Sequence, residues 1–269
     1  MRVMLNGVTY RVRVTGAGTP LLLLHGFTGT GATWEPFLPV LAGRYRTIAP
    51  DLLGHGETDA PGDPQRYRME RCAADLLALL DILGAARCHV VGYSMGGRVA
   101  LHLALAAPER VRALVLVGAS PGIADPVERA ARIRQDEALA DFIEREGTAA
   151  FVARWEPLPL FATQARLPEE VRARIRAQRL TQRPEGLANS LRGMGAGAQE
   201  PLVERLGELT MPCLLLAGEL DDKYRGLVRE MADRIPYAET AIVPGAGHAV
   251  HVEQPEAFAA HVTAFLSKH

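Results

Sequence analysis

Short apolar runs alternate along this chain with longer segments in which apolar residues recur at helical spacing. The segment 1–14 alternates apolar and polar residues around Asn6 and Gly7, which predicts a β-hairpin. Helices are expected at 69–83, 94–107 and 255–265. Buried strands are expected at 20–24, 46–49, 88–92, 113–117, 213–217 and 240–243. This alternation predicts an α/β fold, with a mostly parallel central sheet flanked by helices.

The alternation stops between Pro121 and Pro201. The segment is rich in Arg, Glu and Ala at helical spacing and contains no convincing strand. We therefore expect an all-helical cap at 121–200, inserted after the strand at 113–117 into a core formed by 1–120 and 201–269. Such an insertion can cover the carboxyl ends of the strands, where open α/β sheets bind ligands.

Composition excludes several other classes of protein. The 269 residues are 48% hydrophobic and carry a net charge of −1, which argues against a nucleic-acid-binding protein. The three cysteines (Cys72, Cys88 and Cys213) lack metal-ligand spacing, so we expect free buried thiols in a reducing compartment. No signal peptide or bilayer-spanning run is evident, which predicts a cytoplasmic protein without a membrane partner. We expect either a monomer or a small homo-oligomer.

The strongest chemical signal is a G-x-S-x-G motif centred on Ser94. It lies between the apolar strand expected at 88–92 and a helical segment, which is the context that a nucleophile elbow requires. Glycines permit the sharp turn and close packing of helix on strand. We therefore expect the Ser94 hydroxyl to be exposed at the carboxyl edge of the sheet.

A serine hydroxyl becomes reactive when a neighbouring base accepts its proton. His248 follows the last expected strand in a glycine-rich loop and is the preferred base, with His251 as its rival. Asp221 follows the strand at 213–217 and is the preferred carboxylate to orient the histidine, with Asp222 in reserve. The order serine, acid, histidine is the one found in α/β-hydrolases.

An oxyanion site needs two N–H donors near the serine. The amide of Met95, at the start of the helix after Ser94, is one candidate, and the amide of Phe27, in the turn after the strand at 20–24, is the other. His25, in the same turn, is expected to have a structural role. We expect neither a metal nor a cofactor.

These motifs resemble the α/β-hydrolase superfamily from about residue 18 to the C-terminus. Within it, four segments resemble the 2-succinyl-6-hydroxy-2,4-cyclohexadiene-1-carboxylate (SHCHC) synthases of menaquinone biosynthesis: GYSMGGR at 92–98, ERAAR at 128–132, FVARWEPLPLF at 151–161 and GELDDKY at 218–224. The arginine four places after the serine and the Trp-Glu-x-Leu-Pro-Leu-Phe segment are the most specific of these features.

The resemblance implies a carbon–oxygen lyase that eliminates pyruvate from 2-succinyl-5-enolpyruvyl-6-hydroxy-3-cyclohexene-1-carboxylate, with Ser94 as the base. It also implies a small anionic tricarboxylate as substrate. The residues expected to bind it are Arg98, Arg132 and Arg179, with Arg176 as an alternative to Arg179, and the aromatic residues Tyr93, Trp155 and Phe161. The triad itself does not distinguish elimination from ester or carbon–carbon bond hydrolysis through an acyl-enzyme, which is the alternative.

Overall fold

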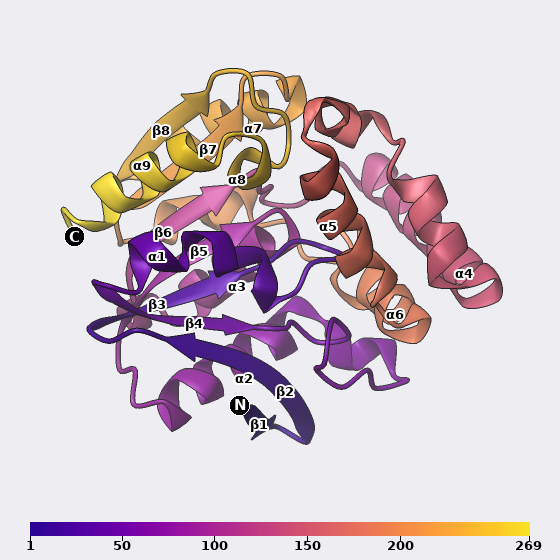
Figure 1. Ribbon diagram of the computed structural model, residues 1–269. Helices are drawn as coiled ribbons and strands as arrows, with labels where there is room; N and C mark the ends of the chain where they lie inside the picture. The colour runs from indigo at the N-terminus through magenta and orange to yellow at the C-terminus, as the bar shows by residue number, and fades with distance from the viewer.

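A computed structural model describes residues 1–269 and contains an eight-stranded sheet (Figure 1). The strand order is β1-β2-β4-β3-β5-β6-β7-β8; β2 pairs antiparallel with β1 and β4, and all other pairs are parallel. The strands are β1 (Arg2–Leu5), β2 (Val8–Thr15), β3 (Thr19–Leu24), β4 (Tyr45–Pro50), β5 (Cys88–Tyr93), β6 (Val111–Val117), β7 (Cys213–Gly218) and β8 (Ala238–Val243). The predicted α/β class is confirmed.

The N-terminal hairpin forms where the alternating pattern predicts it. Leu5 pairs with Val8, so only Asn6 and Gly7 make the turn, and their φ angles are 47° and 84°. A two-residue turn of this kind needs positive φ at both central positions, which explains the choice of Asn and Gly.

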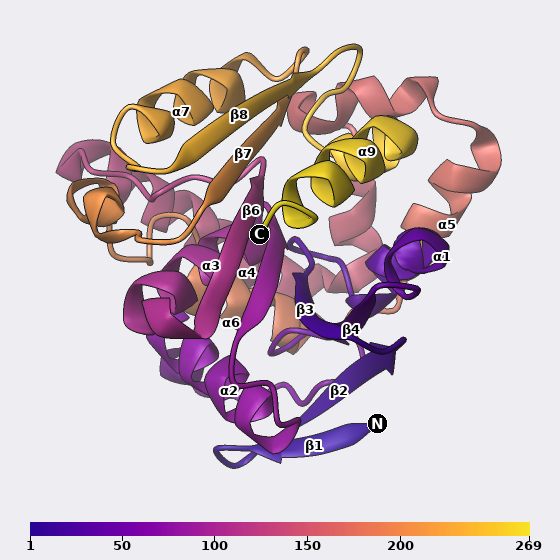
Figure 2. The same ribbon diagram turned by 90° about the vertical axis from the view of Figure 1, so that its left-hand side faces the viewer.

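Helices cover both faces of the sheet (Figure 2). The side chains of β3 show the division, since Leu22 and Leu24 join the larger apolar cluster and Leu21 and Leu23 join the smaller one on the opposite face. Helices α2 (Met69–Ile82), α3 (Met95–Ala106) and α7 (Asp222–Ala232) contribute to the larger cluster, and α1 (Leu38–Leu41) and α9 (Pro255–Leu266) lie on the other side. The short α8 (Val250–Glu253) precedes α9. The three cysteines are free and buried, as expected.

The segment between β6 and β7 contains helices and no strand. Its helices are α4 (Pro126–Trp155), the 3₁₀ helix η4 (Pro159–Arg166), α5 (Glu169–Leu180), α6 (Pro184–Met194) and a second 3₁₀ helix, η5 (Val203–Glu208). Gly147, with φ 80° and ψ 173°, divides α4 into two helical pieces, a break that the sequence pattern does not predict. Although α4 is long, no helix here is apolar enough to cross a membrane.

The inserted helices have a small apolar core of their own. Seven buried side chains of α4 and α6 form it, among them Ile143, Phe151 and Leu187. The helices lie beyond the ends toward which the parallel strands point (Figure 1). The turns that follow these strands therefore face the inserted helices, and the candidate site forms between them.

Candidate active site

Ser94 occupies a strained turn between β5 and α3. Its φ is 51° and its ψ is −110°, a conformation that non-glycine residues rarely adopt and that costs about 1–3 kcal/mol. The neighbouring glycines make the turn possible, because a Cβ on Gly96 would lie 2.3 Å from the Leu24 carbonyl oxygen, and a Cβ on Gly92 would lie 2.5 Å from that of Gly96. Backbone strain at this half-buried serine, whose side chain lines a cavity, indicates a functional position.

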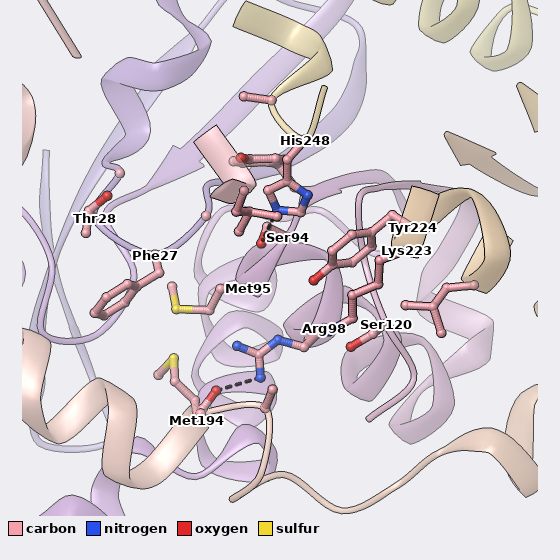
Figure 3. A pocket seen from close by; sticks show the side chains of 18 of the residues that line it. Phe27, Thr28, Ser94, Met95, Arg98, Ser120, Met194, Lys223, Tyr224 and His248 are labelled. Atoms are coloured by element: carbon pink, nitrogen blue, oxygen red, sulfur yellow. Dashed lines mark hydrogen bonds between the residues drawn. The ribbon is translucent and has the colours of Figure 1, made fainter. Parts of the chain in front are cut away.

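Ser94, His248 and Asp221 form a hydrogen-bonded chain. The Ser94 hydroxyl donates to His248 Nε2 over 3.1 Å (Figure 3), and His248 Nδ1 donates to Asp221 Oδ2 over 2.8 Å. Asp221 is the N-cap residue of α7 and is buried, and His248 follows β8. This is the arrangement in which an imidazole withdraws a serine proton and a carboxylate fixes its tautomer.

The two rival residues occupy other environments. The Asp222 side chain is 91% exposed and pairs with Arg225. His251 is buried with its ring 4.3 Å from that of Tyr93 and 5.4 Å from that of Trp34, and burial lowers its pKa to about 3. Neither side chain makes a hydrogen bond to the Ser94 hydroxyl.

The amides of Phe27 and Met95 remain available beside Ser94. Neither donates in the hydrogen bonds of the turns, loops and caps. The Phe27 turn is fixed by His25, whose Nε2 accepts from the Leu52 amide over 2.9 Å, so that Nδ1 donates to the Gly26 carbonyl over 2.8 Å. Burial lowers the pKa of His25 to about 4, which keeps the ring neutral in this structural role.

A cavity of about 590 Å³ lies between the sheet edge and the inserted helices. Every predicted site residue except Asp221 lines it, and Asp221 contacts the far side of the His248 ring. The turns after β3, β5, β6 and β8 contribute to its wall, as do α4, η4, α5 and α6. The volume is typical of a small-molecule site.

Arg98 lies one helical turn after Ser94 and has no carboxylate partner. Its Nη1 donates to the Met194 carbonyl over 2.7 Å (Figure 3) and to Gln199 Oε1 over 2.8 Å, and its Nε and Nη2 make no hydrogen bond with the protein. Burial lowers the pKa of Arg98 to about 10. The guanidinium therefore remains charged at neutral pH and lacks a counter-ion.

The other two predicted arginines each have an acidic partner. Arg132 Nε lies 2.8 Å from Asp136 Oδ1, while the second oxygen of that carboxylate has no partner. Arg179 is buried, 3.3 Å from Glu156 and with its guanidinium carbon 5.2 Å from the centre of the Phe161 ring. Arg176 binds Glu156 from a more exposed position and does not line the cavity.

Aromatic rings form the apolar part of the cavity wall. The Trp155 ring lies 5.4 Å from that of Phe27 and 5.6 Å from that of Phe161. The buried Nε1 of Trp155 has no hydrogen-bond partner. On the triad side of the cavity, the Tyr93 ring lies 5.4 Å from the His248 ring. The cavity thus combines an apolar wall with cationic groups, which suits an anionic ligand that also has an apolar part.

Comparison with known proteins establishes the family. The α/β hydrolase fold family matches residues 19–255. The chain belongs to this family.

Three proteins show how this α/β hydrolase relates to others. It is 47% identical, over 97% of its length and 96% of the relative's, to a Bacillus subtilis (strain 168) protein provisionally named 2-succinyl-6-hydroxy-2,4-cyclohexadiene-1-carboxylate synthase. The structure of MenH from S. aureus superposes with a TM-score of 0.92 at 34% identity, covering 96% of this chain and 98% of that one. The structure of a thermophilic esterase from Thermogutta terrifontis superposes with a TM-score of 0.86 at 29% identity, covering 100% of this chain and 98% of the esterase chain.

The structure of this α/β hydrolase adds two residues that sequence reasoning did not assign to the site. Lys223 and Tyr224 line the cavity, and the Tyr224 ring lies 4.5 Å from that of His248. A signal was present, because Tyr224 is the third residue of the helix that Asp221 caps and its amide donates to Asp221 Oδ1 over 3.3 Å. A residue at this position lies beside the capping side chain.

Proposed function

We propose that this α/β hydrolase is an SHCHC synthase, a carbon–oxygen lyase that eliminates pyruvate from 2-succinyl-5-enolpyruvyl-6-hydroxy-3-cyclohexene-1-carboxylate. The observation that carries the proposal is the convergence of Arg98, Arg132 and Arg179 on the cavity that contains the Ser94 hydroxyl. The name of the Bacillus subtilis relative supports the same reaction.

The structures of substrate and product define the bonds that change. The C2–H bond and the bond from C5 to the enolpyruvyl oxygen break, the C3–C4 double bond is lost, and C2–C3 and C4–C5 double bonds form. The enolpyruvyl oxygen keeps the electron pair of its bond to C5 and leaves as the enolate of pyruvate. The enolate takes up one proton at its terminal carbon to become the ketone, which balances the proton lost from C2. No acyl-enzyme is needed.

The triad supplies the base for this reaction. Ser94 Oγ takes the C2 proton as its own proton passes to His248 Nε2, and Asp221 stabilises the resulting imidazolium. The C2 proton is adjacent to the succinyl ketone, so negative charge develops on the ketone oxygen. The Phe27 and Met95 amides are the donors available to stabilise it.

The three arginines support a preference for a tricarboxylate substrate. A hydrogen bond to a charged group contributes about 1.5–3 kcal/mol. The arginine side chains are already buried or half-buried in the folded protein, so substrate binding removes little further water from them. Arg98 has no acidic partner, so a substrate carboxylate supplies its missing counter-ion. An uncharged ester offers no such partner.

The test supplies the enolpyruvyl substrate and follows pyruvate with lactate dehydrogenase and NADH. The wild-type protein is expected to release one pyruvate per substrate, and Ser94→Ala to lose most of this activity while remaining folded. Release no faster than the spontaneous background would refute the lyase proposal.

Hydrolysis of esters or of carbon–carbon bonds is the second candidate, favoured by the similarity to an esterase and by the triad geometry. It requires an acyl-enzyme on Ser94. Burst kinetics with an activated ester, covalent capture by an organophosphonate and absence of pyruvate release would together favour this activity.

A further inference from the structure

Tyr224 lines the cavity but belongs neither to the triad nor to the arginines that are proposed to bind the substrate. Its ring packs 4.5 Å from the His248 ring with an angle of 46° between the two planes. Its amide donates to Asp221 Oδ1, so the backbone of the first turn of α7 is tied to the triad acid. The position of this side chain is therefore fixed by the same contacts that hold the triad.

The hydroxyl at the end of this ring has no protein partner. It makes no hydrogen bond, and Figure 3 shows it directed into the cavity on the side where Arg98 lies. Burial raises the pKa of Tyr224, so the hydroxyl remains protonated and able to donate. A donor that faces a cavity without an acceptor is suited to a ligand oxygen.

The nearby guanidinium has donors that are likewise unused. Both hydrogen bonds that Arg98 makes to the protein come from Nη1, which leaves Nε and Nη2 available. A carboxylate accepts two parallel hydrogen bonds from one edge of a guanidinium and still has lone pairs for a third donor. The Tyr224 hydroxyl and the free Arg98 donors together match one carboxylate.

We propose that Tyr224 is a substrate-binding residue whose hydroxyl donates to the same substrate carboxylate that Arg98 binds. This inference rests on the proposed lyase function, since that substrate supplies the carboxylates. The two parts of the side chain have separate tasks: the ring supports the His248 imidazole, and the hydroxyl contributes to affinity and to selection for an anionic substrate.

Two substitutions separate these tasks. Tyr224→Phe keeps the ring and removes the hydroxyl, so kcat is expected to stay close to wild type while kcat/KM falls roughly 10- to 100-fold, the effect of one hydrogen bond to a charged group. Tyr224→Leu removes the ring as well, so kcat is also expected to fall. Tyr237→Phe is the matched control, because Tyr237 is 63% exposed and does not line the cavity.

A double variant tests whether Tyr224 and Arg98 share one carboxylate. The loss in Tyr224→Phe with Arg98→Lys is expected to be smaller than the product of the two single losses, because each substitution weakens the same contact. Multiplicative losses would assign the hydroxyl to a different group and overturn the proposal.

The outcomes distinguish this inference from the proposed function. An active wild type with unchanged kcat/KM in Tyr224→Phe would refute the role of Tyr224 alone. A fall in kcat without a change in KM in that variant would also refute it, since the hydroxyl would then act on the reacting atoms. A wild type that releases no pyruvate above background would refute the lyase proposal first, and this inference with it.

Discussion

Replacing Arg98 by alanine tests the electrostatic part of the mechanism. The side chain has two free donors, Nε and Nη2, and a positive charge without an acidic partner. Alanine removes all of these from the cavity and leaves Ser94, one helical turn earlier, in place. The expected result is weaker substrate binding and slower turnover.

The magnitude follows from the donors that are lost. Two hydrogen bonds to a carboxylate contribute about 1.5–3 kcal/mol each, and two bonds to one group are not fully additive, so we expect a total of about 3–4 kcal/mol. This corresponds to a fall in kcat/KM of about 10²–10³-fold. Arg98→Lys keeps the charge but not the paired donors, so its loss is expected to be about tenfold.

A second effect of the substitution is on stability. The Met194 carbonyl and Gln199 Oε1 lose their donor, which costs about 1–3 kcal/mol for each acceptor left unsatisfied. Urea denaturation measures this cost separately from kinetics. Arg205→Ala serves as control, because Arg205 pairs with Glu208 on the surface and does not line the cavity.

The assay is pyruvate release at several substrate concentrations, with folding checked by circular dichroism. An unchanged kcat/KM in folded Arg98→Ala would remove Arg98 from the site and refute the electrostatic argument. A loss matched by Arg205→Ala would refute it equally, because a remote charge would then have the same effect.

Three further predictions concern the triad and the buried histidines. Ser94→Gly is expected to be inactive yet more stable to urea than Ser94→Ala by about 1 kcal/mol, because glycine accepts the φ of 51° without strain; equal stabilities would contradict the strained elbow. Asp221→Asn is expected to lower kcat by about 10⁴-fold with little change in fold, because the amide favours the wrong tautomer of His248; near-normal turnover in the pyruvate assay would exclude Asp221 as the orienting group. Burial lowers the pKa of His25 and His89 to about 4 and of His251 to about 3, below the ordinary value of 6.5, so the unfolded chain binds more protons and the free energy of unfolding is expected to fall as the pH is lowered from 6.5 to 5. Urea denaturation across that range measures the slope of the free energy of unfolding against pH, and His89→Phe is expected to reduce this slope. A free energy of unfolding that does not change with pH would contradict the prediction.

The core elements were predictable because burial imposes a simple pattern. A strand such as β5, covered on both faces, is a continuous apolar run, and only its ends are uncertain: the expected strand 113–117 begins two residues earlier, at Val111, in the structure. The triad candidates were identifiable for a related reason, since the carboxyl ends of parallel strands meet at one edge.

The inserted helices were harder to place because their faces depend on tertiary contacts. Arg176 and Arg179 are three residues apart on α5, and the packing of this helix against α4 decides which of the two side chains lines the cavity. By contrast, Arg132 and Asp136 are four residues apart on α4, a spacing at which a helix pairs opposite charges, and the break in α4 falls at a glycine, Gly147. Tyr224 was missed because an aromatic residue near a helix start has no distinctive pattern of its own.

The most direct test of the central claim is single-turnover pyruvate release from substrate deuterated at C2, compared with the unlabelled compound. The account predicts slower release from the deuterated substrate, because Ser94 Oγ removes this hydrogen, and background rates for both compounds in Ser94→Ala. Equal rates for the two compounds in the wild type, with the chemical step shown to limit the turnover, would contradict proton abstraction at C2 as the step that this site performs.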